Sequence, residues 1–514
     1  MTGAPPGKGR TGRRRRAAVV DATPVKRPAP TPISPRLRLQ LLDDSELQRI
    51  HEASLEILTR TGVVFGSALA LDHFRRAGTR VDGKRVFIDA DLLDRCVASA
   101  PSQYRLRGRN RVHDVLIGGD ACAVMPGGGA PFVRDLDGAR RPGTLKDLEN
   151  LARLSAVAPQ IHVAARKAVE AQDIPVSIRH LKCWCSMIEI TDKPIQSGFS
   201  GGRAEVDDVL GMLAIAFGGE AEIQGSPVMH CSVNVNSPLT FDTAMVESLI
   251  RCAEYGQPVL ISPFVMAGVT GPTTLAGAIA QQNAEVLAGV VLTQLVRLGT
   301  PVLYGTASSN VDMRSAAPAI GSPESALSIA LCAQLARHYR LPCRGGGALT
   351  DSPVPDAQSQ YERMFTLMVS FLSGVNYLMH GVGILESYLT MSFEQFVIDL
   401  ELIDTIHHFS KPLEISEETL ALDTIHAVGP GGYFLDAAHT LQRYRDAFFM
   451  PAIGIRSGFE QWEAAGGVDA LTRANRRCRE LLATYEPPSL ADGIRDRLHD
   501  YVDARSRVLL ARGT

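Results

Sequence analysis

Eight short apolar segments, each followed by an amphipathic segment of roughly 12 to 20 residues, organise the chain from about residue 112 to residue 412. Each apolar segment ends near Gly, Ser, Asn or Pro. Short runs without a polar face are typical of strands that are buried on both sides by helices. Eight strand-then-helix units in sequence predict an α/β fold, a closed (β/α)8 TIM barrel. The expected strands are residues 123–125, 162–165, 194–198, 228–233, 258–262, 301–305, 342–346 and 376–381.

The helices of this barrel are expected between the strands, where apolar residues recur at helical spacing. An open, doubly wound sheet is the alternative fold. It lacks a dinucleotide-binding fingerprint, because Gly381 and Gly383 have no third glycine at the required step. The expected helices are residues 145–155, 176–189, 206–217, 240–255, 275–298, 323–339, 357–373 and 392–408.

The composition on either side of the barrel predicts three further segments. Residues 1–35 are rich in Pro, Gly and Arg and are expected to form a disordered basic tail. Residues 36–110 are expected to form an N-terminal helical cap, residues 111–412 the barrel, and residues 413–514 a C-terminal helical module that folds back on it. A twin-arginine export signal is not favoured, because Asp21 and Lys26 interrupt the residues after the arginines.

Charge, cysteine content and hydropathy argue against a nucleic-acid-binding, disulfide-linked or membrane-spanning protein. A formal net charge of -2 provides no overall field for nucleic acid or an anionic membrane. The nine cysteines are odd in number and scattered through apolar stretches, so we expect a reducing, cytoplasmic location and no disulfide framework. The longest apolar stretch, residues 287–304, contains Gln294 and Arg297, and we therefore expect no membrane span.

In a barrel of this kind, binding and catalytic residues collect at the carboxyl ends of the strands. Two glycine groups there suit either tight turns or the close approach of a bulky cofactor. Neither is followed by the Lys-Ser/Thr pair of a phosphate-binding loop. The residues expected at these ends are Gly127, Gly128, Asn234, Asn236, Phe264, Tyr304, Arg314, Gly345, Gly346, Gly347, Asp351, His380, Glu386 and Tyr388.

Several motifs, each weak alone, are specific in combination and extend over about residues 40 to 490. Together they resemble the trimethylamine methyltransferase family. They are Asp312-Met313-Arg314, Gly321-Ser322-Pro323-Glu324, Asp356-Ala357-Gln358, the segments 381–387 and 393–399, and Gly429-Pro430-Gly431-Gly432-Tyr433-Phe434-Leu435 with His439-Thr440.

The resemblance implies a barrel that passes a methyl group from a methylamine or betaine to the Co(I) of a corrinoid (cobalamin) on a small partner protein. Archaeal members of the family carry pyrrolysine, which would fall near residues 350–355, where this chain has only standard residues. The chain therefore resembles the branch without pyrrolysine, whose substrates are quaternary amines. A small methylated amine and a corrinoid-binding protein are the expected partners, with no corrinoid held tightly by this chain.

When a quaternary ammonium loses one methyl group, a neutral amine leaves. The protein therefore has to bind the cation, position one methyl group for transfer and exclude water. Phe264, Tyr304 and Tyr388 are the candidate ring walls. Asp351 or Glu386 is the candidate counter-charge, and these two acids with His380 form the expected catalytic group. Arg314, Asn234 and Asn236 are candidates for holding a betaine carboxylate. Each residue is equally compatible with an ordinary role as a core aromatic, a helix cap or a scaffold ion pair.

Three alternatives stay open at this stage. His230, Cys231, Cys343 and His380 could be drawn as a zinc site, but their spacing matches no compact motif and we expect no metal. A barrel enzyme of another class would need a lysine or metal cluster at the strand ends, where lysines are nearly absent. A protein that binds betaine without turning it over would keep the same cation cage. The sequence also leaves open whether the chain forms a homo-oligomer.

Overall fold

A (β/α)8 barrel forms the body of the protein in the computed structural model, which describes residues 38–512. The expected tail at residues 1–35 lies outside this range. The barrel closes where the backbone N–H of His162, just before β9, donates to the carbonyl oxygen of Val124 in β6 (2.9 Å). The parallel strands in order are β6 (Ala123–Val124), β19 (Tyr377–Met379), β18 (Cys343–Gly346), β15 (Val302–Gly305), β13 (Val259–Pro263), β11 (Met229–Val235), β10 (Ile195–Gly198) and β9 (Ala164–Ala165).

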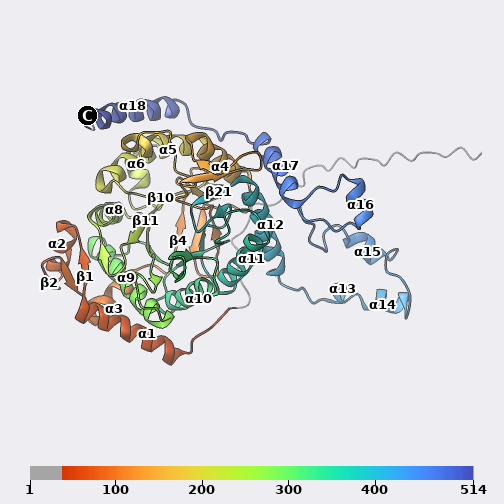
Figure 1. Cartoon of the computed structure of the whole chain (residues 1–514), viewed down its shortest axis with the longest axis horizontal. Helices are drawn as coiled ribbons and strands as arrows, with labels where there is room; N and C mark the ends of the chain where they lie inside the picture. Colours follow the sequence, from red (N-terminus) through yellow and green to blue (C-terminus); the bar gives the residue numbers. More distant parts are fainter. Residues whose placement is uncertain (1–37, 513–514) are drawn as a thin grey trace, which may run out of the picture.

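Helices surround these strands as a ring (Figure 1). Every expected strand and helix overlaps an observed one, so the predicted fold class is confirmed. Side-chain caps begin several helices; the Asp356 carboxylate accepts from the backbone N–H of Ser359 at the start of α11 (2.9 Å). The ring consists of α4 (Leu145–Val157), α5 (Val176–Ile190), α6 (Gly202–Phe217), α8 (Thr243–Glu254), α9 (Leu275–Val296), α10 (Pro323–His338), α11 (Ala357–Leu372) and α12 (Phe393–Phe409), with the short α7 (Glu220–Ile223) after α6.

Helix α9 is long and apolar enough to cross a membrane by length and composition alone. However, 83% of its apolar window is buried inside the protein. The N-terminal helices α1 (Asp44–Glu56), α2 (Ala68–Arg76) and α3 (Ala90–Ser99) pack against it. A helix that is largely apolar all round is typical of a buried core position. Its composition is therefore explained by its place in the core.

Strands accompany the helices of the N-terminal segment. After a π-helical turn at Ile57–Thr61, β1 (Val63–Phe65), β2 (Arg80–Asp82) and β3 (Arg85–Phe87) form a small sheet with β12 (Thr240–Phe241) from a barrel loop. The hairpin of β4 (Gln103–Leu106) and β5 (Val115–Gly118) encloses a 3-10 turn at Arg111–His113 and spans the boundary that the sequence placed at residue 110. The N-terminal segment is thus continuous with the barrel through backbone pairing.

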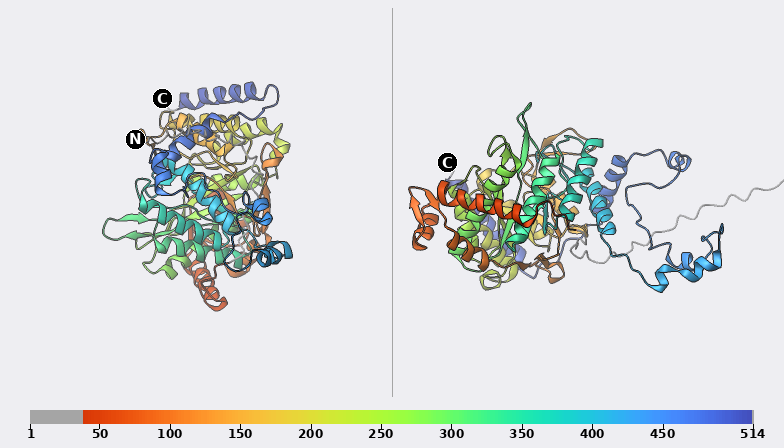
Figure 2. Two further views of the ribbon diagram at one scale, coloured as in Figure 1. Left: turned by 90° about the vertical axis from the view of Figure 1, so that its right-hand side faces the viewer. Right: turned by 90° about the horizontal axis from the view of Figure 1, so that it is seen from below.

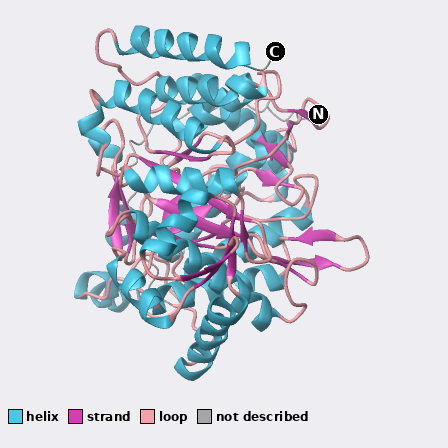
Figure 3. Cartoon of the chain, turned by 90° about the vertical axis from the view of Figure 1, so that its left-hand side faces the viewer, coloured by secondary structure: helices cyan, strands magenta, loops and turns pink. Residues whose placement is uncertain are grey.

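Two small sheets extend the loops at the carboxyl end of the barrel, and Figure 3 shows such strands outside the central barrel. One contains β14 (Met266–Ala267), β16 (Ser309–Asp312) and β17 (Ala317–Ala319). The other contains β20 (Ile384–Leu385), β21 (Thr390–Ser392), β7 (Phe132–Arg134) and β8 (Arg141–Pro142). Four of the expected site residues flank the strands of these sheets, namely Phe264, Arg314, Glu386 and Tyr388.

The C-terminal helices divide into two groups. α17 (Ala470–Ala483) packs on α12 and α4, and α18 (Ile494–Arg512) packs on α5 and α6. The helices α13 (Glu417–Leu420), α14 (Leu422–Val428), α15 (Ala438–Arg443) and α16 (Phe459–Ala464) instead extend away from the barrel (Figures 1 and 2). Of these six helices, α17 and α18 are the two that pack on helices of the barrel.

Candidate active site

Aromatic side chains close the amino end of the barrel interior. His230 on β11 and Tyr377 on β19 come from non-adjacent strands, yet their ring centroids lie 4.7 Å apart. Tyr104 from the β4–β5 hairpin reaches up to them, with its hydroxyl 2.8 Å from Nε2 of His230. Burial lowers the pKa of His230 to about 3, so the ring is neutral. These three rings form a floor, and any ligand must bind above it.

Arg344 on β18 lies inside the barrel above this floor. Its Nη1 donates to Ser262 Oγ on β13 (3.3 Å) and to the carbonyl oxygen of Thr306. β15 separates β13 from β18, so a side chain that bridges them must cross the interior. The residue is 2% exposed, and its Nε is buried without a hydrogen-bond partner.

No carboxylate among the described residues neutralises Arg344. Burial lowers its pKa, and the groups that act in the opposite direction are two tyrosines and a cysteine rather than an acid. A guanidinium keeps its proton in proteins, so a buried positive charge remains here without a counter-ion. Buried charges are normally paired, which makes Arg344 a candidate for binding an anionic group of a ligand.

Three ring side chains cluster near Arg344. The rings of His380 and Tyr388 have centroids 4.6 Å apart, and Phe264 meets Tyr388 edge-on at 6.2 Å. The charge of Arg344 acts on the pKa of both His380 and Tyr388, which places them within Coulombic reach of it. Two of the three expected ring walls, Phe264 and Tyr388, are therefore brought together.

His380 is held in one protonation state. The backbone N–H of Gly128 donates to its Nδ1 (3.2 Å), so that nitrogen carries no proton and the neutral ring carries its proton on Nε2. Burial, with a smaller contribution from Arg344, lowers the pKa of His380 well below its usual value. The imidazole is therefore available as a neutral hydrogen-bond donor.

The loop that presents Tyr388 is strained. Glu386, Ser387 and Tyr388 all have positive φ angles, of 53°, 48° and 78°. Side chains other than glycine rarely adopt this conformation, and such residues persist only where the surroundings hold them. Hydrogen bonds to two carboxylates hold the loop in this conformation. Asp351 accepts from Ser387 Oγ (2.6 Å), and Glu386 accepts from Nε of Arg140 (2.8 Å).

The two expected counter-charges therefore already have partners. Asp351 also accepts from the backbone N–H groups of Ile320 and Gly321, and burial raises its pKa. Glu386 pairs with Arg140 and accepts from Thr390 Oγ1 (2.6 Å). Both acids fix the loop around Tyr388 in this structure, and their direct contact with a substrate stays a prediction.

The two asparagines lie at the open end of β11. Asn234 is exposed and pairs in register with Ser262, which itself contacts Arg344. Asn236 is also exposed, and its backbone bridges to Thr240. Asn234 therefore lies on the strand position next to the Arg344 contact, whereas Asn236 belongs to the following turn.

Tyr304 and Arg314 lie away from this cluster. The Tyr304 hydroxyl donates to Asn283 on α9 (3.0 Å) and its ring stacks on Tyr339, so the side chain lies between the strands and the helices. Arg314 is at the β16–β17 turn, where its side chain is 91% exposed and pairs with Asp312. Neither residue faces the barrel interior with Phe264 and Tyr388.

Packing within the protein explains most of the expected cofactor glycines. A Cβ at Gly127 would lie 2.7 Å from Met391, and one at Gly345 2.9 Å from Val375. Cβ atoms at Gly346 and Gly347 would lie 2.5 Å from Leu349 and 2.6 Å from Gly381. Only Gly128 leaves ordinary space, with 3.4 Å to Met379. Internal packing thus accounts for the lack of a side chain at four of these glycines, and their contact with a corrinoid stays a prediction.

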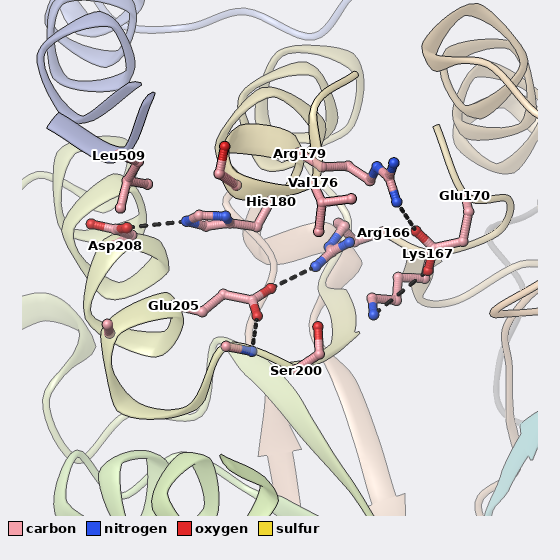
Figure 4. A pocket seen from close by; sticks show the side chains of 13 residues that line it. Arg166, Lys167, Glu170, Val176, Arg179, His180, Ser200, Glu205, Asp208 and Leu509 are labelled. Carbon is pink, nitrogen blue, oxygen red and sulfur yellow. Dashed lines mark hydrogen bonds and ion pairs between the residues drawn. The ribbon is translucent and has the colours of Figure 1, made fainter. Parts of the chain in front are cut away.

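A separate cavity of about 570 Å³ lies beside α5 and α6, outside the strand layer (Figure 4). Arg166 follows β9 and pairs with Glu205 on α6 (2.9 Å), while His180 pairs with Asp208 (3.0 Å). Lys167, a lysine at a strand end, pairs with Glu170 (3.6 Å). Since the charges that line the cavity neutralise one another, it presents no single charge to a ligand.

The four candidate zinc ligands, His230, Cys231, Cys343 and His380, do not come together at one point. His230 lies on the floor of the barrel and His380 near its mouth, each held by the contacts above. All nine cysteines are free and buried, and burial raises the pKa of both Cys122 and Cys343. Such thiols behave as core residues.

A model of the trimethylamine methyltransferase family matches residues 8–509 of the chain. The chain belongs to this family. Its relatives include the glycine betaine methyltransferase of Desulfitobacterium hafniense (strain Y51), at 41% identity over 91% of this chain and 98% of the relative. The trimethylamine methyltransferase MttB of D. hafniense (strain DSM 10664 / DCB-2) is 34% identical over 90% and 92%. The proline betaine:corrinoid methyltransferase of Eubacterium limosum is 28% identical over 89% and 96%.

The barrel of this family member is similar to a solved structure of the monomethylamine methyltransferase of Methanosarcina barkeri. The TM-score is 0.54, at 10% identity, over 87% of this chain and 89% of the other. At this level of identity the likeness establishes the fold only.

Sequence reasoning missed Arg344, although a signal for it existed. The strand at residues 342–346 was predicted, and roles were assigned to its glycines but not to Arg344, the one charged residue within it. A charged residue in a strand buried on both faces is rarely fully buried unless it is paired or functional. That rule would have selected Arg344 over the exposed Arg314.

Proposed function

We propose that this chain transfers a methyl group from a betaine, a quaternary amine that also carries a carboxylate, to a corrinoid held by a partner protein. The observation that carries the proposal is Arg344, a buried guanidinium in the barrel interior that has no acid partner within residues 38–512. Family membership and the names of the betaine-specific relatives support the same substrate class.

Both charges of a betaine have a complement in this arrangement. Arg344 offers hydrogen bonds and a full charge to the carboxylate, and His380 Nε2–H offers a further donor nearby. Phe264 and Tyr388 provide ring faces for the ammonium, each contributing roughly 0.5 to 2 kcal/mol. Because Arg344 repels a cation, the ammonium is directed toward the rings and the open end of the barrel.

This orientation places an N-methyl group outward, where a methyl acceptor can approach. A corrinoid in its Co(I) state supplies the nucleophile for such a reaction. The C–N bond breaks, its electron pair returns to nitrogen, and a neutral tertiary amine leaves, so the chain needs no acid or base for this step. What the residues provide is alignment and exclusion of water.

The experiment combines the purified chain, a reduced corrinoid protein and a panel of amines, and follows the absorbance change of the corrinoid on methylation. We expect glycine betaine or another betaine to react at least ~10-fold faster than trimethylamine, which lacks both the carboxylate and the activated nitrogen. Comparable rates on trimethylamine would contradict the proposal. Betaine binding by calorimetry without any methyl transfer would instead indicate a betaine-binding protein without catalytic activity.

A further inference from the structure

The C-terminal helix α18 makes only a small apolar contact with the body of the protein. It lies along α5 and α6 at the edge of the barrel (Figure 1). Over residues 494–511 the buried side chains are Leu498, Val502 and Ser506, and the segment 486–493 that leads into the helix is largely exposed. Two buried aliphatic side chains are few for a helix of 19 residues. The position of α18 therefore depends on the polar side chains that face α5.

Ion pairs connect α18 with α5. Glu189, near the end of α5, contacts His499 (2.9 Å) and Arg495 (3.2 Å), and Lys182, two turns earlier on α5, contacts Asp503 (3.1 Å). The two helices therefore run antiparallel. In each pair at least one side chain is more than half exposed, and ion pairs of this kind contribute little to stability. These pairs alone are a weak attachment for the helix.

A thiol lies between these ion pairs. Cys185 is one helical turn before Glu189, so both side chains lie on the same face of α5. At 7% it is the most exposed of the nine cysteines. Its Sγ, a carboxylate oxygen of Glu189 and a ring nitrogen of His499 all lie within 4.8 Å of one another. The two packed helices thus bring a sulfur, an oxygen and a nitrogen ligand together.

We propose that Cys185, Glu189 and His499 bind one Zn²⁺ ion, which fastens α18 to α5. Thiolate, carboxylate and imidazole are the protein ligands of zinc, at bond lengths of about 2.0 to 2.3 Å. A tetrahedral site with these bonds separates its ligand atoms by about 3.5 Å, so rotation of the half-exposed His499 and Glu189 side chains closes the group. The thiol releases its proton when the metal binds, and water occupies the fourth position.

The ligand types and the local charges favour zinc over other common cations. Sulfur and imidazole ligands disfavour Mg²⁺ and Ca²⁺, which prefer oxygen. A thiolate and the Glu189 carboxylate together balance the charge of Zn²⁺, and the Asp503 carboxylate lies within Coulombic reach of Cys185. Arg495 competes for Glu189, but its side chain is 60% exposed and turns to water at small cost.

The metal would also fix the part of α18 that borders the cavity beside α5 and α6. Leu509, farther along the helix, lines this cavity (Figure 4), and Arg505 pairs with Asp208 in its wall (2.6 Å). Because α18 is one continuous helix, fastening it at His499 holds both of these contacts in place. The inference is independent of the substrate and of methyl transfer.

The first test uses the full chain without an affinity tag, stripped of metal by a chelator and kept reduced with a phosphine. Co²⁺ serves as a coloured probe for the zinc site. We expect one equivalent of Co²⁺ to bind with the near-ultraviolet charge-transfer band of a cobalt–thiolate bond, and Zn²⁺ to displace it. Competition with a chelating dye should give a Kd for Zn²⁺ of about 1 µM or lower.

Variants assign the ligands. Cys185→Ser should abolish the charge-transfer band, and His499→Gln should weaken Zn²⁺ binding roughly 100-fold or more, since even the loss of a residue that only supports a ligand costs 10- to 100-fold. Arg495→Gln, which removes the competing cation, should tighten binding roughly two- to fivefold. The matched control is Cys478→Ser with His426→Gln, the same two types of change away from α5 and α18, and it should bind as the wild type does.

The second test follows the attachment of α18 by limited digestion with trypsin. The enzyme cleaves at Arg497 and Arg505 only when the helix has left α5 and unwound. Zn²⁺ at about ten times its Kd should slow this cleavage about 10-fold in the wild type and leave it unchanged in His499→Gln.

Three results would overturn the proposal. The first is a wild type that shows no cobalt–thiolate band. The second is a band that persists in Cys185→Ser, which would place the metal at another thiol. The third is equal protection by Zn²⁺ in the wild type and in His499→Gln, which would show that the metal does not fasten α18. Since His499 is exposed, its replacement leaves folding intact, and circular dichroism checks this.

Discussion

Replacing Arg344 with Met tests the proposed carboxylate contact directly. Met has a similar length without the charge, so the change removes the attraction while filling much of the space. In the free protein the loss of bonds to Ser262 and Thr306 is offset by the removal of an unpaired buried charge. We therefore expect the free energy of unfolding to change by only about 1 kcal/mol.

The effect on betaine should be much larger. Losing a charge-assisted contact in a site closed from water costs about 3 to 4 kcal/mol, or roughly a 100- to 1,000-fold fall in kcat/KM. Tetramethylammonium has no carboxylate, and its slower demethylation should be unchanged or faster in the Arg344→Met protein. The assay is the corrinoid absorbance change with both substrates, together with the thermal midpoint of the same sample.

Two results would refute this reasoning. A variant that loses activity equally on both substrates, with a large fall in thermal midpoint, would make Arg344 a scaffold residue. A wild-type rate on betaine in Arg344→Met, with the loss appearing instead in Arg314→Met, would return the carboxylate site to the exposed arginine that was one of the three candidates from the sequence.

Three further predictions concern the Glu386–Arg140 pair, Tyr304, and Lys193, which is buried just before β10. Glu386→Gln and Arg140→Met should each lower the methyl-transfer rate, and the double variant should lower it no further, because one ion pair holds the loop around the site. A faster Arg140→Met enzyme would instead indicate that the freed Glu386 carboxylate contacts the substrate cation. Tyr304→Phe should cost about 1 to 3 kcal/mol of stability and leave the rate per folded molecule unchanged, and an altered KM would return Tyr304 to the site. Burial lowers the pKa of Lys193 from 10.5 to about 7, so between these values the unfolded chain binds more protons and stability rises with pH. In denaturant titrations the free energy of unfolding of the wild type should rise by on the order of 2 kcal/mol between about pH 7 and pH 9, and Lys193→Met should lack this rise. The same pH dependence in both proteins would contradict this assignment.

The barrel could be predicted from the sequence because its signals are local. A strand covered on both faces must be apolar along its whole length, and the following helix shows its own period, so each unit can be recognised without knowing its neighbours. The N-terminal strand β1 was not predicted, because it pairs with β12, more than 170 residues later in the chain. Pairing partners at such a distance leave no local pattern.

The membership of the site was decided by the tertiary structure. The sequence placed the rings of Phe264, Tyr388 and Tyr304 together at strand ends. Whether a side chain points into or out of the barrel depends on strand register, because a shift of one residue turns every side chain to the opposite face. Register puts Tyr304 against α9 and Arg344 inside the barrel. Likewise, Glu386 pairs with Arg140, a partner 246 residues away in the sequence. Apolar period and motif are properties of a segment, whereas the direction and pairing of a side chain belong to the closed barrel.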